Sequence, residues 1–598
     1  MFSTRPTLQG TFGMVSSTHW LASTAAMAIL EDGGNAFDAA VAAGFTLQVV
    51  QPHLNGPAGE VPVLFAPAGG RPLVLCGQGG APAGATIEHF TGLGLDMVPG
   101  TGPLAAAVPG AFDAWLLLLR DHGTKRLSEV LERAIGYAEH GHPALDGVGR
   151  AVESVRGLFE KEWPSSAELY LADGRSPAPG ALLRNRALAA TWRRVLAETE
   201  RRGLTREAQI DAARRVWSHG FVAEALADFA ARPTMDTSGE RHQGVLTADD
   251  LASFEAGYEE PVSYDWNGWT VCKPGLWSQG PVFLQQLALL PETLTHSTPE
   301  YGDADFLHRL IEGTKLAMAD REAWYGAGTE VAPAELLAPG YTEQRRALIT
   351  ERASAELRPG RPGGRVPKLG AHVRRRTPVD PATDAGSGEP TIAENGAPRG
   401  DTCHLDVVDR WGNLVSATPS GGWLQSNPVV PGLGFPLGTR LQMALLTPGL
   451  PNSLAPGRRP RTTLSPSLAL RDGQPVLAFG TPGGDNQDQW SLHFFLAVVL
   501  RDRQRGGLDL QGAIDAPNWR TESFPSSFYP RAMNPASVVV ESRVGESTIA
   551  ELRRRGHLVK VSGPWSQGQL CAVARDPETG VLSAGADPRY RQAYAVGR

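Results

Sequence analysis

The 598-residue sequence predicts an α+β protein with a mainly helical first part and a strand-rich last part. Three observations predict this class. Apolar residues recur at helical spacing over much of 105–350, seven prolines interrupt residues 358–400, and alternating apolar residues resume directly after residue 402. Because the proline-rich stretch has few large apolar side chains, it cannot offset its chain entropy, and we expect a flexible linker over 358–401.

Composition narrows the classes of function. An apolar content of 41% and a charged content of 20% are ordinary for a globular protein. The formal net charge of -7 does not favour a nucleic-acid or membrane partner. With no apolar leader and no run of 18 apolar residues, we expect a soluble, cytoplasmic protein. Four scattered cysteines form no CxxC pair and are expected to be reduced: Cys76, Cys272, Cys403 and Cys571.

The first 77 residues predict two helices and a hairpin. Apolar residues at helical spacing predict a helix over 23–32, which a Gly-Gly pair ends. Asn35, with Asp38 three residues on, predicts the capped start of a second helix. Two β-rich runs, 63–65 and 72–75, flank a glycine turn and predict a hairpin.

Helices and hairpins follow in the remaining chain. Helical patterns are clearest over 104–120, 127–139, 304–325 and 490–500. Turn residues between β-rich runs predict three hairpins, 403–409 with 414–418, 468–471 with 476–479, and 570–574 with 581–584. The tetrapeptide Trp-Ser-Gln-Gly occurs at 277–280 and 565–568, and two copies do not make a structural repeat.

The junction at Asp401 and Thr402 carries the first chemical signal. A threonine hydroxyl is a poor nucleophile at neutral pH and needs a neighbouring base. If the chain is cut between Asp401 and Thr402, the new α-amine, with a pKa of about 8, can accept the hydroxyl proton. A threonine that opens a strand after a loop is also ordinary, so the junction alone leaves both interpretations open.

A glycine pair carries the second signal. Gly483 and Gly484 stand between a predicted strand and an apolar helix, where two backbone N–H groups beside a helix N-terminus can stabilise an anion. A tight strand-to-helix turn is the alternative. His140 and His142 could suggest a metal, but no third ligand stands at a useful spacing, so we expect no metal site.

Taken together, these features resemble the γ-glutamyltransferase family, the γ-glutamyltranspeptidases and their relatives, over nearly the whole chain. The matching segments come in family order: Gly13–His19, Gly33–Val41, Gln51–His53, Val108–Gly110, Leu246–Leu251, Ala317–Arg321, Asp401–His404, Asp409–Asn413, Arg459–Pro466, Thr481–Gly484 and Ala586–Arg589.

The resemblance implies an N-terminal-nucleophile αββα sandwich of two antiparallel sheets flanked by helices. Self-cleavage would give a large subunit, 1–401, and a small subunit, 402–598. Thr402 would be the nucleophile, Ser420 would support it, and Gly483 and Gly484 would hold the oxyanion. No metal or organic cofactor is implied. The implied partners are the two subunits of one precursor and a small amide substrate, and a homo-oligomer stays open.

The substrate pocket departs from the family pattern. Thr462 and Thr463 match a serine pair that contacts the substrate head group. Gln78 stands where γ-glutamyl enzymes have an arginine that clamps the α-carboxylate, and an amide is neutral. Arg440 and Arg461 are additional positive charges near the same segments, which could bind an anionic group or be solvated surface residues.

Two further departures concern the neighbourhood of these residues. The segment 437–442 lacks the acid that would bind an α-ammonium. Cys403 replaces a threonine beside the nucleophile, which weakens a possible hydrogen bond and leaves the rate of self-cleavage open.

We therefore expect a self-processing amidohydrolase or acyltransferase that acts on a small amide other than a γ-glutamyl peptide. The sequence looks closer to oxamate-type amidohydrolases and β-lactam side-chain acylases than to transpeptidases. A γ-glutamyl hydrolase or transpeptidase is the alternative within the family. An uncleaved, non-catalytic binding or assembly protein is the alternative of another class, and the retention of Thr402, His404, Ser420 and the glycine pair argues against it.

Overall fold

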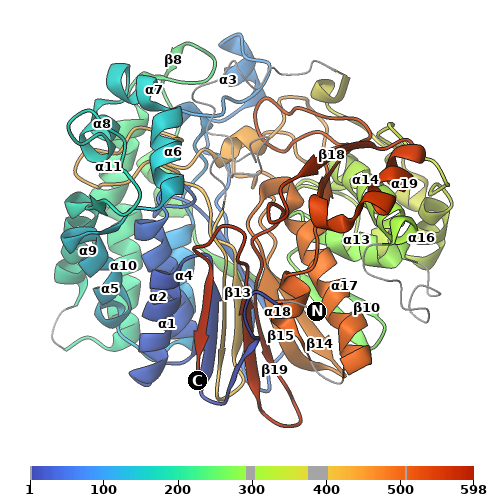
Figure 1. Ribbon diagram of the computed structural model, residues 1–598. Coiled ribbons are helices and arrows are strands. Elements are labelled where there is room, and N and C mark those ends of the chain that lie inside the picture. The colour runs from blue at the N-terminus through green and yellow to red at the C-terminus, as the bar shows by residue number, and fades with distance from the viewer. Residues whose placement is uncertain (1–2, 201–202, 291–302, 375–401, 506–507) are drawn as a thin grey trace.

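The computed structural model describes residues 3–200, 203–290, 303–374, 402–505 and 508–598. Two seven-stranded sheets lie face to face at the centre of the molecule, and helices cover the outer face of each (Figure 1). This arrangement is the αββα sandwich that the resemblance implied, and it confirms the predicted fold class.

Both sheets are antiparallel throughout. The first sheet has the order β21 (Tyr594–Gly597), β2 (Gly13–Ser17), β12 (Leu405–Asp409), β13 (Leu414–Ala417), β3 (Val61–Ala66), β4 (Leu73–Gly77) and β9 (Gly257–Glu259). The second sheet has the order β1 (Leu8–Gly10), β20 (Leu582–Ala586), β19 (Cys571–Arg575), β15 (Gln474–Gly480), β14 (Ser467–Arg471), β11 (Trp269–Lys273) and β10 (Val262–Trp266).

The four hairpins predicted from turn residues are present as β3–β4, β12–β13, β14–β15 and β19–β20. The β12–β13 turn forms because Asp409 accepts hydrogen bonds from the backbone N–H groups of Trp411, Gly412 and Asn413 at 3.0–3.1 Å. Its other carboxylate oxygen accepts from Ala36 N at 2.9 Å, which ties the turn to the start of the second helix.

Alternation along β12 separates two cores. Val408 packs between the sheets with Leu468, Ala478 and Val573. Val407 points the opposite way, into the core under the helices. Residues with the parity of Val408 therefore face the space between the two sheets.

Helices pack on the outer face of each sheet, to the left and right in Figure 1. The helices around the first sheet are α1 (Trp20–Glu31), α2 (Ala36–Val50), α4 (Ala111–His122), α5 (Leu127–His140), α9 (Arg186–Thr199), α10 (Arg206–His219) and α11 (Phe221–Ala230). Those around the second sheet are α13 (Pro281–Leu289), α14 (Ala304–Trp324), α17 (Gln487–Arg505), α18 (Leu510–Ile514) and α19 (Glu546–Arg554).

Helix starts follow the local sequence. Asn35 caps α2, and Asp38 completes the predicted capping box. The helix predicted over 104–120 begins only at Ala111, because Pro109 lacks an amide donor and Gly110 precedes the first turn. Residues 103–105 form a separate 3-10 turn.

Shorter elements complete the chain. The remaining helices are α3 (Ile87–Gly92), α6 (Asp146–Ser154), α7 (Arg156–Lys161), α8 (Pro164–Tyr170), α12 (Ala248–Ser253), α15 (Pro333–Leu337) and α16 (Pro339–Arg346). The strands β5 (His142–Pro143) and β6 (Leu182–Leu183) pair, as do β7 (Thr234–Met235) and β8 (Arg241–His242), and β16 (Trp519–Thr521), β17 (Ser537–Glu541) and β18 (Leu558–Ser562) form a three-stranded sheet.

The start of the predicted linker is packed. Gly360 N donates to Asp320 Oδ1 at 2.7 Å, and its carbonyl accepts from Trp324 Nε1 at 3.1 Å. Arg345 Nη2 donates to the Arg358 carbonyl at 2.6 Å. The expectation of flexibility is therefore corrected for 358–374, because buried side chains of α14 and α16 satisfy its backbone. The rest of the predicted linker, 375–401, lies outside the described residues.

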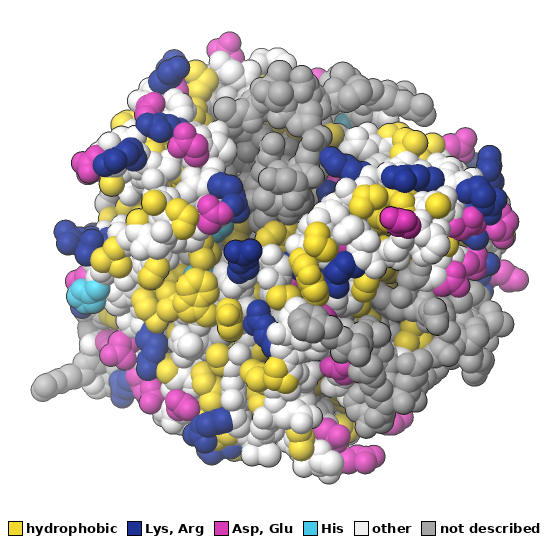
Figure 2. All heavy atoms as spheres, in the orientation of Figure 1, with side chains coloured by type: hydrophobic (Ala, Val, Ile, Leu, Met, Phe, Trp, Pro, Cys, Tyr) yellow, Lys and Arg dark blue, Asp and Glu magenta, His cyan; other side chains and the backbone are white. Residues whose placement is uncertain are grey.

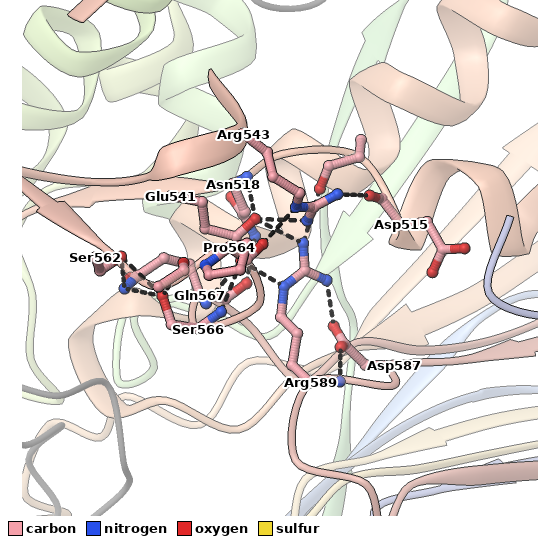
Figure 3. Close-up of polar contacts among 12 residues, drawn as sticks. Asp515, Asn518, Glu541, Arg543, Ser562, Pro564, Ser566, Gln567, Asp587 and Arg589 are labelled. Atoms are coloured by element: carbon pink, nitrogen blue, oxygen red, sulfur yellow. Dashed lines mark hydrogen bonds and ion pairs between the residues drawn. The ribbon is translucent and has the colours of Figure 1, made fainter. Parts of the chain in front are cut away.

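The second Trp-Ser-Gln-Gly copy supports a buried ion network at the end of β17. Glu541 accepts from Ser566 N and Gln567 N at 2.9 and 3.0 Å and forms an ion pair with Arg589 at 2.7 Å (Figure 3). Arg589 also pairs with Asp587 at 3.0 Å. The Ala586–Arg589 segment thus fixes the end of β20 to the three-stranded sheet.

On the face shown in Figure 2, Lys and Arg side chains are interspersed with Asp and Glu side chains around the rim. Such a mixed distribution gives this face no field of a single sign. Among the helices of the described ranges, none is both long enough and apolar enough to span a bilayer.

Candidate active site

Polar residues lie in one row at the ends of neighbouring strands of the first sheet. Thr402 pairs with Ser420, and Ser420 pairs with Glu60, as isolated antiparallel bridges that continue the β12–β13 and β13–β3 registers. Residues directly opposite each other in antiparallel strands project to the same face. Thr402 has the parity of Val408, so this row faces the space between the sheets.

Gln78 extends the row to a fourth strand. The β3–β4 register pairs Val61 with Gly77, which places Gln78 next, opposite Glu60. Neighbouring strands are about 4.8 Å apart, so the row spans roughly 14 Å from the backbone of Thr402 to that of Gln78. All four side chains of the row are buried, with Gln78 only 2% exposed.

Thr402 and Ser420 are in direct contact. Thr402 Oγ1 donates to Ser420 Oγ at 3.3 Å, and Arg440 Nη2 donates to the same oxygen at 3.0 Å. Arg440 also forms a buried ion pair with Glu60. Burial raises the pKa of Glu60, and the adjacent guanidinium opposes this rise. The row therefore holds a hydroxyl pair and an ion pair side by side.

Arg440 is held in an aromatic cage. Its guanidinium lies 5.3 Å from the centroid of Trp423 and 6.0 Å from that of Phe528, and Nη1 contacts Met443 Sδ at 3.4 Å. With 2% exposure, Arg440 is not the solvated surface residue considered as one alternative from the sequence. Its partner Glu60 was not predicted from the sequence. The only sequence signal for Glu60 was that it continues the alternation of side chains along β3.

The strand that carries Thr402 is fixed on both faces. Cys403 Sγ lies 3.1 Å from Gln51 Oε1 and 3.1 Å from Asn55 Nδ2, on the helix side of the first sheet. His404 points between the sheets, where Nδ1 contacts Thr418 Oγ1 at 2.9 Å and Nε2 contacts Asp406 Oδ1 at 3.0 Å. Burial raises the pKa of Asp406.

The glycine pair follows β15 of the second sheet and precedes α17. Gly483 has φ +130°, and a Cβ there would lie 2.3 Å from the ring of Trp490. Gly484 has φ +52°. Asn486 N donates to the Gly483 carbonyl at 2.9 Å, which closes the turn. The geometry is a tight strand-to-helix turn, and the same backbone conformation is suited to an anion site at the start of α17.

A network of ion pairs holds the residue that follows the glycine pair. Asp485 forms an ion pair with Arg321 and accepts from Ser527 N at 2.8 Å and from Ser527 Oγ at 2.6 Å. Arg321 also pairs with Glu322 at 2.9 Å. The resemblance assigns no role to the segment Ala317–Arg321. In the structure, Arg321 lies under the glycine pair.

Arg461 belongs to the same network rather than to the row of Thr402. Its Nη2 pairs with Glu322 at 2.7 Å, and its side chain is 2% exposed, so it too is not a solvated surface residue. Although burial acts in the opposite direction, Arg461 and Arg321 hold the pKa of Glu322 well below its usual range. The two arginines predicted near the pocket are thus both neutralised by buried glutamates.

The segment 457–465 connects the row to the glycine turn. Gln78 Nε2 donates to the Pro460 carbonyl at 2.6 Å at one end, and Ser465 N donates to Gln487 Oε1 at 3.1 Å at the other. Between them, Thr462 N donates to the Trp277 carbonyl at 2.9 Å. The structure therefore brings Gln78 into contact with the segment that contains Thr462 and Thr463. Asp401, on the other side of the predicted cut, lies outside the described residues.

The histidines singled out from the sequence do not form a pair. The His142 side chain is buried, and burial lowers its pKa to about 4. The His140 side chain is 79% exposed. A different group, His308, Glu312 and His557, brings potential metal-binding atoms together within 4.8 Å of one another.

That group is held by internal contacts. His308 Nδ1 lies 2.8 Å from His557 Nε2, and Glu312 pairs with Lys315 at 2.7 Å and with Arg358 at 3.2 Å. A carboxylate already neutralised by two cations is a poor ligand for a further cation.

Comparison with known proteins agrees with the geometry. A family model described as Gamma-glutamyltranspeptidase matches residues 22–597. The chain is 31% identical to an oxamate amidohydrolase proenzyme of Klebsiella pneumoniae subsp. pneumoniae, over 98% of each chain. It is 69% identical to the solved structure of LmbA2991T421A over 100% of each chain, with a TM-score of 0.95. Against a cephalosporin acylase from Bacillus halodurans, the TM-score is 0.80 at 27% identity, over 100% of this chain and 97% of that chain.

The family match and the shared fold support an enzyme rather than the binding-protein alternative. The chain belongs to the gamma-glutamyltranspeptidase family and is an enzyme of its N-terminal-nucleophile hydrolase and acylase type.

Proposed function

We propose that the protein cuts itself between Asp401 and Thr402 and then hydrolyses, or transfers the acyl group of, a small amide. The observation that carries this proposal is the buried Thr402 Oγ1, 3.3 Å from Ser420 Oγ at the open end of β12. The similarity to an oxamate amidohydrolase proenzyme supports both the processing and the small amide substrate.

The chemistry uses the α-amine that the cut creates. This amine accepts the proton of Thr402 Oγ1 as the oxygen attacks the substrate carbonyl. The carbonyl oxygen becomes an oxyanion, which the backbone N–H groups of Gly483 and Gly484 stabilise. The α-ammonium then gives its proton to the leaving amine, the C–N bond breaks, and an ester on Thr402 remains. Water or a second amine resolves the ester by the same proton transfers in reverse order.

Ser420 and Arg440 position the nucleophile. Because Arg440 Nη2 donates to Ser420 Oγ, one lone pair of that oxygen is fixed, and the remaining one is directed towards Thr402 Oγ1. The ion pair with Glu60 holds the guanidinium in place. The pair thus acts on the nucleophile through Ser420.

The substrate is a small amide without a γ-glutamyl head group. A substrate α-carboxylate is best matched by a free cation, whereas Arg440 and Arg461 are each paired with a buried glutamate and Gln78 is neutral. A γ-glutamyl hydrolase is the alternative that family membership supports. Release of p-nitroaniline from γ-glutamyl p-nitroanilide, at a rate comparable with that from simple acyl anilides, would favour it.

The test of the proposal is the intact mass of the denatured protein. Wild type is expected to give a 401-residue and a 197-residue chain (598 − 401), while Thr402→Ala stays whole. Thr91→Ala is a matched control, because Thr91 is exposed and bonds only to its own helix. Wild type that stays uncut after long incubation, or a Thr402→Ala protein that is cut as wild type is, contradicts the mechanism.

A further inference from the structure

Arg531 is a buried arginine whose guanidinium is only partly satisfied. The residue is 6% exposed, and its Nη2 donates to the carbonyls of Gln442 and Ala444 at 2.8 and 3.1 Å. Its Nη1 is shielded from solvent and, among the described residues, has no hydrogen-bond partner. Because buried polar groups in folded proteins are paired as a rule, this nitrogen calls for a further acceptor.

The same side chain borders a small cavity. The cavity has a volume of about 30 Å³ and is lined by residues 96–97, 371–372 and 444–447 and by Arg531. One water molecule needs roughly 10–15 Å³, so the cavity is large enough for a water molecule or a small ion. It is too small for the acyl chain of a substrate.

The charges around Arg531 do not balance. Arg321 and Arg461 both pair with Glu322, at 2.9 and 2.7 Å, and Arg321 also pairs with Asp485. After burial, these four charged groups have the largest effects on the pKa of Arg531. Three arginines thus share two carboxylates, which leaves one positive charge in excess.

The excess charge persists at neutral pH. Burial lowers the pKa of Arg531 to about 10, so the guanidinium is still protonated there. A buried charge without a counter-charge costs free energy. A water molecule in the cavity would accept from Nη1 but would bring no charge, whereas a small anion would supply both the acceptor and the missing negative charge.

The other side chains at the cavity permit an anion. The His372 side chain is 8% exposed, and its Nε2 lies 3.5 Å from Glu322 Oε2. Glu322 itself is not among the lining residues, so the imidazole rather than this carboxylate forms the wall. Asp96 does line the cavity, but it is exposed, and solvent weakens its repulsion of an anion.

We propose that Arg531 binds one small monovalent anion, such as chloride, in this cavity. Nη1 pairs with the anion while Nη2 keeps its two backbone carbonyls. No residue of the row of Thr402 lines the cavity, so the site is separate from the nucleophile and the inference does not depend on the amidase function.

The anion would stabilise a segment that the active site uses. The carbonyls that Arg531 holds belong to the last residues of the 3-10 turn Arg440–Met443 and to Ala444 directly after it. Fixing Arg531 therefore fixes the chain on which Arg440 is carried.

The first test is thermal unfolding at constant ionic strength, with chloride replacing gluconate in steps. Gluconate is too large for the cavity and serves as the reference anion. The Tm of wild type is expected to rise by about 1–2 °C and then to saturate, because only the folded chain has the site. A Tm that does not change, or that rises without saturating, overturns the inference and leaves a water molecule as the partner of Nη1.

Variants assign the effect to Arg531. Arg531→Gln keeps a donor for the backbone carbonyls and removes the charge, so the saturable effect of chloride should disappear. Arg352→Gln is the matched control, since Arg352 also donates to a backbone carbonyl, that of Arg554 at 3.1 Å, but is exposed. It should keep the wild-type response. A wild-type response in Arg531→Gln contradicts the assignment.

Asp96→Asn tests the site without disturbing a buried residue, and it applies even where Arg531→Gln fails to fold. Removal of the negative charge at the rim should lower the half-saturating chloride concentration by about twofold to fivefold. An unchanged concentration contradicts a site at this cavity.

Bromide locates the site directly, because it has the charge of chloride and scatters X-rays anomalously. Crystals grown with bromide are expected to show an anomalous peak within hydrogen-bonding distance of Arg531 Nη1. Crystals in which no peak lies beside Arg531 overturn the inference.

Discussion

Arg440 Nη2 lies 3.0 Å from Ser420 Oγ, and this single hydrogen bond joins a buried ion pair to the hydroxyl that contacts Thr402. The bond is possible because the Glu60 backbone pairs with Ser420 while the Glu60 carboxylate holds the guanidinium. Loss of either member of the ion pair should therefore disturb the position of the nucleophile.

Arg440→Met is expected to lower the free energy of unfolding by about 3–5 kcal/mol, because it leaves the buried Glu60 carboxylate without a partner. The double variant Glu60→Gln/Arg440→Met should recover part of that loss, since no charge is then left unpaired. Urea unfolding measures both effects. A double variant less stable than Arg440→Met by the full Glu60→Gln effect would show that the two side chains do not interact.

Ser420→Ala should slow self-cleavage by roughly 10²-fold, because the hydroxyl that contacts Thr402 Oγ1 is lost. Ser420→Thr keeps the hydroxyl and should restore most of the rate. The rate constant comes from the appearance of the 197-residue chain by intact mass. Equal rates for Ser420→Ala and wild type would remove Ser420 from the mechanism.

Gly483→Ala is expected to destabilise the protein and reduce kcat, because the new Cβ would lie 2.3 Å from the Trp490 ring at φ +130°. Gly473→Ala is the matched control, since Gly473 also has a positive φ, +76°, but no atom within 4 Å of a new Cβ. The control should cost only the backbone strain, about 1–2 kcal/mol, and leave kcat unchanged. Thermal unfolding and anilide hydrolysis of the two variants separate steric overlap from strain.

Asp485→Asn should weaken the support of the glycine turn, because it removes one charge of a buried pair with Arg321. We expect a loss of about 3–5 kcal/mol in unfolding free energy and a fall in kcat with little change in KM. Arg309→Gln removes a half-exposed ion pair with Asp305 and should cost less than about 1 kcal/mol. A large rise in KM with kcat intact would instead place Asp485 in substrate binding.

Stability is expected to fall as the pH drops below about 6.5. Burial lowers the pKa of His19, His53 and His493 to about 3, so the unfolded chain binds protons that the folded chain does not. Each histidine contributes a slope of up to about 1.4 kcal/mol per pH unit in this window, and none above it. Burial raises the pKa of Asp587 to about 6 and also raises the pKa values of Glu60, Asp320 and Asp406, which acts in the opposite direction. His142 and His557, whose pKa values burial lowers to about 4 and about 3, add to the histidine effect.

Urea unfolding from about pH 7.5 to about pH 4.5 measures this slope. His53→Gln should reduce it, while a substitution of the exposed His140 should not. A stability that rises towards acid pH would contradict the histidine account.

Local sequence signals were sufficient for much of the fold. The capping box of Asn35 and Asp38 and the turn residues of the four hairpins act over a few positions, so they can be recognised without a structure. The start of α4 and the packed segment 358–374 were predicted wrongly. The latter depends on Asp320 and Trp324, whose contacts with Gly360 join distant parts of the chain.

The site was predictable where a motif carried it. Thr402, Ser420 and the glycine pair were proposed from motif positions, and the structure brings Thr402 and Ser420 into contact. Glu60 could not be found, because its importance comes from strand register and from an arginine far along the chain. For the same reason, the sequence did not show that Arg440 is internally neutralised.

The order of strands in the first sheet has a consequence for how the protein can be made. Strands from before and after residue 402 are interleaved, since β2 lies between β21 and β12, and β13 pairs with β3, where β21, β12 and β13 come from the last third of the chain and β2, β3 and β4 from its beginning. Neither fragment alone has a complete row of hydrogen-bonding neighbours for its strands. Two separately synthesised halves would each expose unpaired strand edges, whereas in a single polypeptide each set of strands supplies hydrogen-bonding partners for the other.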